Sequence, residues 1–578
     1  MTVPYTFATA PSPLPLSQLD ANFAAVGNST NTSYNEGGTG AVTRTVQNKL
    51  QESVSVFDFM TTAQISDVQA KTLTVDVSTP IQNAINNNDH VYFPPGDYRC
   101  DSQIALRANL TLTGAGAGVT RLKKVTTTYG GVLCANSGST TAQFANITLR
   151  DFTVFDDVAT LGFSEQQHLL TLHGVDNVLI DRVGFYGFRG DGLLIGEWTD
   201  TVRTRLNTNI NVTNCLFDGV NKDNRNGISV ITGNRITIAN NVFQNVTRSN
   251  MPGAIDLEPD TSTTSVITNI TISGNRFFNV GGTEGAVCVY IASTVSAFQN
   301  LTVVGNTFDT CSYGFTVNGS RVTTQSQNIS YSGNVMTSVG QGFRLLSATN
   351  RGITISGNTF FCSGTSLLGF DDTNTVQDIV VSNNTFHNST SSSTGALTIN
   401  SQAKNIVVSS NTFNNWYDNA IKIGTNAGDS ISQINIVNNV AQNLRGAAYL
   451  VQYSAGTLDG ASCVYMNNIG NGSNTSRFWR TDDPGAVTND TTALSFNSAT
   501  LPNSFSLGNS MAIINGDTGV PSTGGYQGTL IAVKSLTSKF TYQLYYPANN
   551  TVKVGSFYMR KCNNAANSWT AWYEFAGV

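Results

Sequence analysis

The fold of this chain is decided by the segments ITIANNVF (residues 236–243), ITISGNRF (270–277), LTVVGNTF (301–308) and ITISGNTF (353–360). Each segment opens with alternating apolar residues, which indicates a strand with one buried face, and each has asparagine at its sixth position. Related segments begin at Ile210, Ile329, Ile379, Ile406 and Ile434, and weaker ones at Leu110, Ile147 and Val178. From Ile210 onward, successive starts are 24–34 residues apart, so the chain contains an internal repeat.

A single repeat of this kind cannot bury its apolar face, so neighbouring repeats must stack to complete a core. The period, the short strands and the lack of helical periodicity predict an all-β fold, a right-handed parallel β-helix of about 11–12 coils. The sixth-position asparagines are expected to bond along the axis as a ladder. They are Asn241, Asn275, Asn306, Asn334, Asn358, Asn384, Asn411 and Asn439.

A second strand is predicted in each coil, in segments such as NGISVI (226–231), GAIDLE (253–258) and GAVCVY (285–290). Alternation directs one set of side chains inward: Ile228, Ile255, Val287, Phe315, Phe343, Leu397 and Ile421. The outward column reads Ser229, Asp256, Cys288, Thr316, Arg344, Thr398 and Lys422. We expect the outward columns to form an exposed, ridged face along the rod.

Composition excludes several classes of protein. Charged residues make up 12% of the 578 residues and the formal net charge is −5, which argues against a nucleic-acid partner because such proteins need a basic face. The 64 asparagines and 53 glycines suit strands joined by turns. The eight cysteines form no CxxC pair, which predicts buried thiols rather than disulfides or a zinc site. No secretory signal and no membrane-spanning apolar run is recognised.

The flanks of the repeat differ from its body, which predicts five regions. Residues 1–50 form an attachment segment with one short helix at residues 16–26, and residues 51–109 open the β-helix with a helix at residues 80–87. Residues 110–450 form the β-helix body, and residues 451–510 a connecting β region. Residues 511–578 show a compact β pattern typical of a separate small module.

Several of these segments resemble known families. VSVFDFM (54–60) and PIQNAINNNDHVYFPPGDYRC (80–100) resemble the opening of pectate-lyase-like β-helix domains, in which a short helix caps the first coil. The stretch from RNGISV through GAIDLEP (225–259) resembles a recurrent segment of the same superfamily. Residues 1–26 resemble attachment segments of bacteriophage tail proteins, and the C-terminal module resembles the knob-like ends of phage tail fibres.

The order of these resemblances is that of a phage tailspike depolymerase. The resemblance implies a homotrimer carried on the virion, bound to phage tail or adaptor proteins through residues 1–50. It also implies action outside the host cell on a bacterial surface polysaccharide, capsule or O-antigen. No cofactor, no nucleic acid and no membrane insertion is expected.

The strongest candidate for chemistry is an acidic pair, Asp256 and Glu258. Alternation places both carboxyl groups on one face, with Ile255 and Leu257 inward. Glycoside hydrolysis usually requires two carboxyl groups, and two adjacent acids push their pKa values apart, which separates an acid from a base. Glu284, at the start of the next coil's second strand, is a third candidate catalytic carboxylate. The alternative interpretation is a solvated turn edge or a structural cluster.

Two groups of side chains are candidates for substrate binding. Around the pair these are Asp223, Arg225, Arg248, Tyr290 and Arg344, and each also fits a solvated surface residue. A second patch contains Asp191 and Trp198, because an exposed tryptophan can stack on a sugar ring while acids bond its hydroxyls. No metal is expected, since the pairs Asp156–Asp157 and Asp371–Asp372 are better explained by turn chemistry.

The sequence therefore predicts an endo-acting glycosidase, with Asp256 and Glu258 as acid and base or nucleophile and Glu284 in reserve. A polysaccharide lyase is a first alternative, in which Arg225, Arg248 or Tyr290 would act as the base. A non-catalytic adhesin of the virion is a second. An esterase is the least supported, because His168 and His173 have no G-x-S-x-G nucleophile segment to serve.

Overall fold

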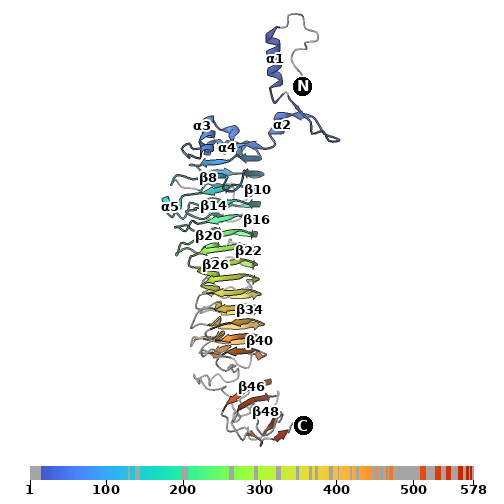
Figure 1. The fold of residues 1–578 in the computed structure, drawn as a ribbon, viewed down its shortest axis with the longest axis vertical. Helices are drawn as coiled ribbons and strands as arrows, with labels where there is room; N and C mark the ends of the chain where they lie inside the picture. Colours follow the sequence, from blue (N-terminus) through green and yellow to red (C-terminus); the bar gives the residue numbers. More distant parts are fainter. Residues whose placement is uncertain are drawn as a thin grey trace.

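Three parallel β-sheets run along the molecule and close into a right-handed β-helix, which gives the rod in Figure 1. The computed structural model describes residues 15–30, 32–127, 131–136, 143–196, 206–259, 266–291, 297–319, 327–346, 350–362, 368–370, 375–388, 395–400, 402–416, 419–424, 428–444, 450–453, 457–458, 464–466, 468–472, 508–515, 527–534, 542–547, 557–563, 568–571 and 573–575. The predicted fold class is confirmed.

Sheet 1 contains the strands that the repeat segments predicted, with 16 strands in all. Its strands are β3 (Val54–Ser55), β4 (His90–Phe93), β7 (Leu110–Gly114), β10 (Phe144–Arg150), β13 (Val175–Asp181), β16 (Thr208–Thr213), β19 (Gly233–Ala239), β22 (Val266–Ser273), β25 (Ala297–Val304), β28 (Ile329–Ser332), β31 (Asn350–Ser356), β34 (Thr375–Ser382), β37 (Gln402–Ser409), β40 (Ser430–Val437), β43 (Thr457–Leu458) and β44 (Val464–Met466).

Sheet 2 follows sheet 1, after a two-residue corner except between β7 and β8, and has 14 strands. They are β5 (Gly96–Arg99), β8 (Thr120–Lys123), β11 (Thr153–Phe155), β14 (Gly184–Tyr186), β17 (Leu216–Asp218), β20 (Val242–Val246), β23 (Arg276–Val280), β26 (Thr307–Cys311), β29 (Val335–Val339), β32 (Thr359–Cys362), β35 (Thr385–Asn388), β38 (Thr412–Asn414), β41 (Val440–Leu444) and β45 (Ile469–Gly472).

Sheet 3 is the second predicted strand series, and its 13 strands give 13 coils that contain all three sheets. They are β6 (Ile104–Leu106), β9 (Leu133–Asn136), β12 (Leu170–His173), β15 (Leu193–Gly196), β18 (Ile228–Val230), β21 (Gly253–Leu257), β24 (Gly285–Ile291), β27 (Tyr313–Gly319), β30 (Gln341–Leu346), β33 (Leu368–Phe370), β36 (Leu397–Ile399), β39 (Ile421–Ile423) and β42 (Val451–Tyr453). The sequence missed β33, in which Gly369 stands at the outward position and interrupts the series of side chains there.

The corner between sheets 1 and 2 carries the predicted asparagine ladder. Asn275 shows the pattern: its Oδ1 accepts from the backbone N–H of Asn241 at 2.9 Å and from the Asn241 side-chain amide at 3.0 Å. Its own Nδ2 donates to the carbonyl of Ile238 and to Oδ1 of Asn306. The same bonds repeat down to Asn439 and continue to Asn468, which the sequence alignment did not include. Each amide is buried, so the ladder satisfies polar groups that water does not reach.

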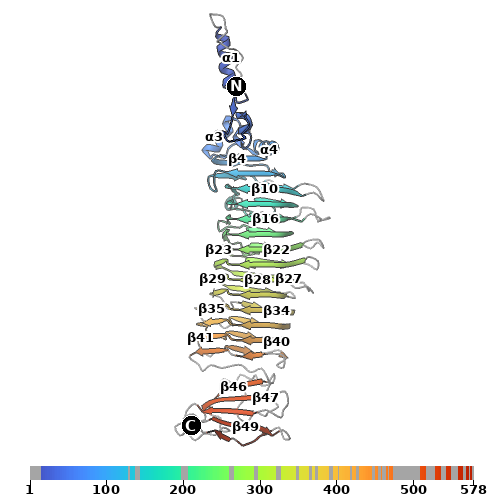
Figure 2. The ribbon, with the colours of Figure 1, turned by 90° about the vertical axis from the view of Figure 1, so that its right-hand side faces the viewer.

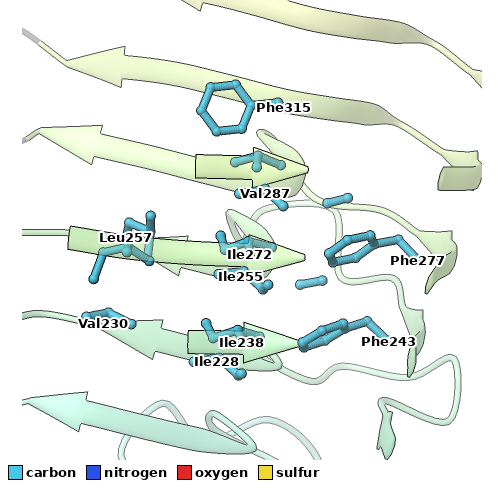
Figure 3. Close-up of a cluster of buried hydrophobic side chains, with 14 of the residues drawn as sticks. Ile228, Val230, Ile238, Phe243, Ile255, Leu257, Ile272, Phe277, Val287 and Phe315 are labelled. Carbon is cyan, nitrogen blue, oxygen red and sulfur yellow. The ribbon is translucent and has the colours of Figure 1, made fainter. Parts of the chain in front are cut away.

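Aromatic rings fill the interior beside this ladder. Phe185, Phe217, Phe243, Phe277 and Phe308 stack in register, with neighbouring ring centroids 4.6–5.0 Å apart. The inward residues of sheet 3 lie in the same buried cluster, as Figure 3 shows for Ile255 and Leu257 of β21. The predicted inward series of sheet 3 is fully buried throughout. The five cysteines whose state the structure records, Cys100, Cys134, Cys215, Cys288 and Cys311, are free.

The two ends of the rod are covered by different elements. At the N-terminal end, α4 (Ser78–Asn87) turns Ile81, Ala84 and Ile85 into the first coil, beside η2 (Val56–Phe59) and α3 (Thr62–Ala70). Beyond them lie α2 (Val46–Leu50), the hairpin β1 (Ser33–Tyr34) and β2 (Arg44–Thr45), and α1 (Leu16–Val26), whose bounds match the predicted helix. The remaining helix, α5 (Val158–Leu161), lies at the side of the rod.

The C-terminal strands form an antiparallel sheet past the last coil (Figure 2). It contains β46 (Gly508–Asn515), β47 (Gln527–Lys534), β48 (Tyr542–Pro547), β49 (Phe557–Asn563), β50 (Ser568–Trp569) and β51 (Tyr573–Phe575). Among the described helices, none combines the length and the apolar character that crossing a membrane requires.

Candidate functional site

Strand β21 sets the direction of the candidate carboxyl groups. Its residues Ile255 and Leu257 lie in the core (Figure 3). Asp256 between them therefore stands on the outer face of sheet 3. Asp256 is paired in register with Ser229 on β18 and with Cys288 on β24. The predicted outward column is therefore confirmed over these coils, and Thr316 and Arg344 continue it.

The expectation that this column is exposed is wrong. Asp256, Ser229, Cys288 and Thr316 have no exposed surface, and Arg344 is buried as well. Polar side chains from the turns that lead into sheet 3 cover the column; among them, Asn226 donates from Nδ2 to Asp256 Oδ2 at 3.2 Å. Alternation in the sequence specifies the face of the sheet on which a side chain stands. Whether other side chains cover that side chain depends on contacts between coils.

Asp256 and Glu258 form an acidic pair. The pKa of Asp256 is raised well above its ordinary value, first by burial and then by the charge of Glu258. Asp256 Oδ1 faces no donor among the described residues, whereas the side chain of Glu258 is 28% exposed. Burial therefore favours the protonated form of Asp256 more than that of Glu258.

Arg225 connects this pair to the preceding coil. Its Nη1 lies 2.8 Å from both carboxylate oxygens of Asp191, and its Nη2 lies 3.8 Å from Glu258 Oε2. Nδ1 of His168 lies 3.1 Å from Asp191 Oδ2. Burial would raise the pKa of Asp191, but the positive charge of Arg225 and the contact with His168 outweigh it and lower this pKa to about 2. Asp191, which the sequence assigned to substrate binding, is a buried counter-ion here.

Glu284 and Arg344 form a second buried unit along the same face. Arg344 Nη2 lies 2.7 Å from Glu284 Oε2, and its guanidinium lies 3.6 Å from the ring centroid of Tyr313. Arg344 also donates to the carbonyl of Thr283, and Asn318 donates to Glu284 Oε1. Glu284 is thus brought near the acidic pair, but its oxygens are engaged in joining coils.

The other predicted site residues fall into three groups. Asp223 is exposed in the turn before Arg225, and Tyr290 is half-buried on β24. Arg248 points elsewhere, since its guanidinium lies 3.5 Å from the centroid of Phe163 and its Nε donates to Asn250. Trp198 lies outside the described residues.

Sequence reasoning missed His168, Asn226 and Tyr313 as members of the site. Asn226 and Tyr313 have no distinctive spacing, because each lies at the end of a turn whose length differs between coils. In the sequence, His168 entered only the esterase alternative, together with His173. Its role follows from the register of β12 with β15, which brings the segment before β12 alongside the segment before β15. Within the described parts of the chain, no group of three or more His, Cys, Asp or Glu side chains is arranged to hold a metal ion.

Comparisons with known proteins agree with this architecture. Residues 65–344, which include the whole candidate site, match the family model described as rhamnogalacturonase A/epimerase, pectate lyase-like. A comparison with curated proteins found no match.

Several solved structures share the fold. The tailspike protein of Escherichia coli bacteriophage HK620, solved in complex with a pentasaccharide, is 15% identical with a TM-score of 0.52; the match covers 96% of this chain and 98% of that one. Gene product 12 of bacteriophage phi29 is 17% identical with a TM-score of 0.55, over 75% of this chain and 58% of that one. The A-module of the Azotobacter vinelandii mannuronan C-5 epimerase AlgE6 is 17% identical with a TM-score of 0.44, over 72% and 99%. At these identities the likeness is one of fold.

Proposed function

We propose that this chain is a phage tailspike that binds a bacterial surface polysaccharide and depolymerises it by endo-glycosidic hydrolysis. One observation carries the proposal: on the outer face of sheet 3, the fully buried carboxyl group of Asp256 stands beside the partly exposed carboxyl group of Glu258, and burial and the charge of Glu258 raise the pKa of Asp256. Two carboxyl groups in such different surroundings have separated pKa values, which gives the acid and the base that cleavage of a glycosidic bond requires.

The difference in exposure gives the two carboxyl groups different roles. Glu258 meets the polymer, because Asp256 has no exposed surface. The proton of the buried Asp256 passes through Glu258 to the leaving oxygen as the bond between that oxygen and the sugar carbon breaks. The negative charge left on the pair faces the positive charge that develops on the sugar ring, until a water molecule adds to that carbon and its proton returns to the pair. Asp256 and Glu258 thus share the acid and base roles.

The lyase alternative requires a base that can lose its proton. Asp191 raises the pKa of Arg225 above the ordinary arginine value, so Arg225 stays charged. Arg248 is stacked on Phe163. Of the bases that the sequence offered, Tyr290 is the one whose partial exposure leaves a lyase as the second candidate function.

The place of the chain on the virion is proposed from fold and order of parts. The likeness to the HK620 tailspike spans nearly the full length of both chains. By analogy, residues 1–50 would attach to tail or adaptor proteins, residues 511–578 would form the distal module, and three chains would associate. Asp223, Tyr290 and Trp198 are proposed to contact the polymer beside the acidic pair.

The test is incubation of the purified full-length protein with a panel of capsule and O-antigen polysaccharides. Polymer size by gel filtration, new reducing ends and ultraviolet absorbance from a new C=C bond are followed together. Hydrolysis shortens the polymer and creates reducing ends without absorbance, whereas a lyase adds absorbance. The double variant Asp256→Asn/Glu258→Gln is expected to bind the same polymer and to leave it intact.

Matched controls separate loss of chemistry from loss of fold. Asp378→Asn removes an exposed carboxylate on sheet 1 that pairs with Arg351, so its cleavage rate should equal that of the unaltered protein. Cleavage by the double variant at the unaltered rate would overturn the assignment of Asp256 and Glu258. A protein that binds a polymer on whole cells and shortens none would be an adhesin.

A further inference from the structure

Arg225 is fixed at both of its ends. Its backbone N–H donates to the carbonyl of Gly190 at 3.2 Å, which ties the turn to the preceding coil. Its Nη1 contacts both oxygens of Asp191 and donates to Ser229 Oγ at 3.1 Å. Only 13% of the side chain is exposed. A long and flexible side chain is thereby held in one orientation.

We propose that Arg225 is a positioning residue: anchored by Asp191, it holds its positive charge beside Asp256 and Glu258 and so stabilises the negative charge that this acidic pair carries. The link to catalysis rests on the proposed function. The ionisation of Glu258 is a property of the folded chain, so it can be measured without any cleavage of polymer.

The geometry explains how Arg225 acts on the acidic pair. Its Nη2 lies 3.8 Å from Glu258 Oε2, within the range in which opposite charges favour ionisation. Asp256 lies behind Glu258 with no exposed surface and with an amide, Asn226, bonded to Oδ2. A negative charge is less costly on the exposed group next to the cation than on the buried group.

Other titratable groups face these residues from neighbouring coils. Glu165 Oε1 lies 3.7 Å from Arg225 Nε, but more than half of that side chain is exposed. His168 contacts Asp191: its Nδ1 lies 3.1 Å from Asp191 Oδ2, the oxygen that Arg225 also contacts, and accepts from the backbone N–H of Asp191. Beyond Asp256 lie Cys288, whose pKa is raised by burial, and Glu284 in its pair with Arg344. Arg225 is the cation that opposes the rise in the pKa of Asp256.

Three variants of the full-length protein test the proposal. Arg225→Gln removes the charge, Arg225→Lys keeps it without the forked guanidinium, and Asp191→Asn replaces one of the two oxygens that grip Nη1 by an amide donor. Arg351→Gln, which breaks an ion pair on the outside of sheet 1, is the matched control. The pH profile of polymer cleavage is measured for each, with circular dichroism to verify the fold.

The proposal predicts the direction of every shift. Arg225→Gln should move the whole profile upward by about one pH unit, because both carboxyl groups lose a neighbouring cation. Arg225→Lys keeps the positive charge, so its pH profile should lie close to that of the unaltered protein. Asp191→Asn is decisive: if Asp191 positions Arg225, the cation moves away and the profile shifts upward. If Arg225 stays in place without its anchor, loss of a negative charge shifts the profile downward and overturns the proposal.

A second readout works without any activity. Carbodiimide coupling of glycine ethyl ester to Glu258, mapped by mass spectrometry against pH, follows the protonation of that exposed carboxyl group. Its midpoint should shift upward in Arg225→Gln and Asp191→Asn and stay unchanged in Arg351→Gln. Shifted labelling with no polymer cleaved would reject the proposed function and keep the positioning role, whereas labelling midpoints unchanged in both variants would reject the role itself. If Asp191→Asn does not fold, the two Arg225 variants carry the test.

Discussion

The guanidinium of Arg225 lies 2.8 Å from both oxygens of Asp191, a carboxylate with no exposed surface. This pair is the link between the acidic pair on β21 and the segment before β12, three coils earlier. Because it is buried, the loss of either partner leaves an uncompensated charge in the protein, and this gives the first prediction.

Asp191→Asn should lower the free energy of unfolding by about 3–5 kcal/mol at pH 7, measured by chemical denaturation. The pKa of Asp191 is about 2 in the folded protein and 3.8 in the reference state, so its ionised form stabilises the fold above pH 3.8. That contribution, about 2 kcal/mol, is lost as the pH falls toward 2. The exposed-pair variant Asp378→Asn should cost less than about 1 kcal/mol. Equal costs for the two variants would contradict the prediction.

Asp156→Asn should have the opposite effect. Burial raises the pKa of Asp156 to about 6, so its ionisation destabilises the fold as the pH rises from 3.8 through 6. The variant should therefore be more stable than the unaltered protein at pH 7, by up to about 2–3 kcal/mol, and equal to it at pH 4. Asp157→Asn is the control: Asp157 caps α5, and its replacement should cost a similar amount at both pH values. Thermal midpoints across this range provide the measurement.

Asn306→Ala should destabilise the protein by breaking the hydrogen bonds of the asparagine ladder at one coil. The backbone N–H and the side-chain amide of Asn275 would lose their common acceptor, and the carbonyl of Ile272 would lose a donor, all in the interior. We expect a loss of at least about 3 kcal/mol, because each orphaned buried group costs about 1–3 kcal/mol. Ser332→Ala, a half-buried outward position on β28, should cost less than about 0.5 kcal/mol. Comparable losses would mean that the ladder adds nothing to stability.

Glu284→Gln and Arg344→Met should each destabilise the protein, and their effects should not add. Removing one partner leaves the other charge buried, whereas removing both leaves none. A double-mutant cycle should therefore give a coupling energy of about 1–3 kcal/mol. Additive effects would show that the ion pair is not the contact that matters, and that the stacking of Arg344 on Tyr313 dominates instead.

The repeat pattern predicted the fold in detail because two of its signals are strictly local. Alternation identified the buried face of both strand series, and the sixth-position asparagine identified the corner between sheets 1 and 2. Where a coil lacks these signals, prediction failed, as at β33 with its outward Gly369.

The candidate site was predicted only in part. The sequence placed Asp256 and Glu258 on the outer face, but their surroundings depend on how far turn side chains reach along the axis. Arg344 stands three coils beyond Asp256, yet its guanidinium turns back to Glu284. Arg225 was expected to bind substrate, and its ion pair with Asp191 was not predicted. Which of several possible partners a side chain contacts depends on packing between coils. The spacing of residues in the sequence does not specify that packing.

Each coil of the rod contains a segment of constant length at the ladder corner and connections of variable length elsewhere. Each ladder corner is two residues long, the first in a left-handed conformation, as at Gly274 and Gly305. The differences in coil length, 24–34 residues between repeat starts, therefore fall on the connections to either side of sheet 3. Those connections can be lengthened, shortened or grafted from another coil with the interior register unchanged. The outer rim of sheet 3 is thus free to diverge toward new ligands while the scaffold stays the same.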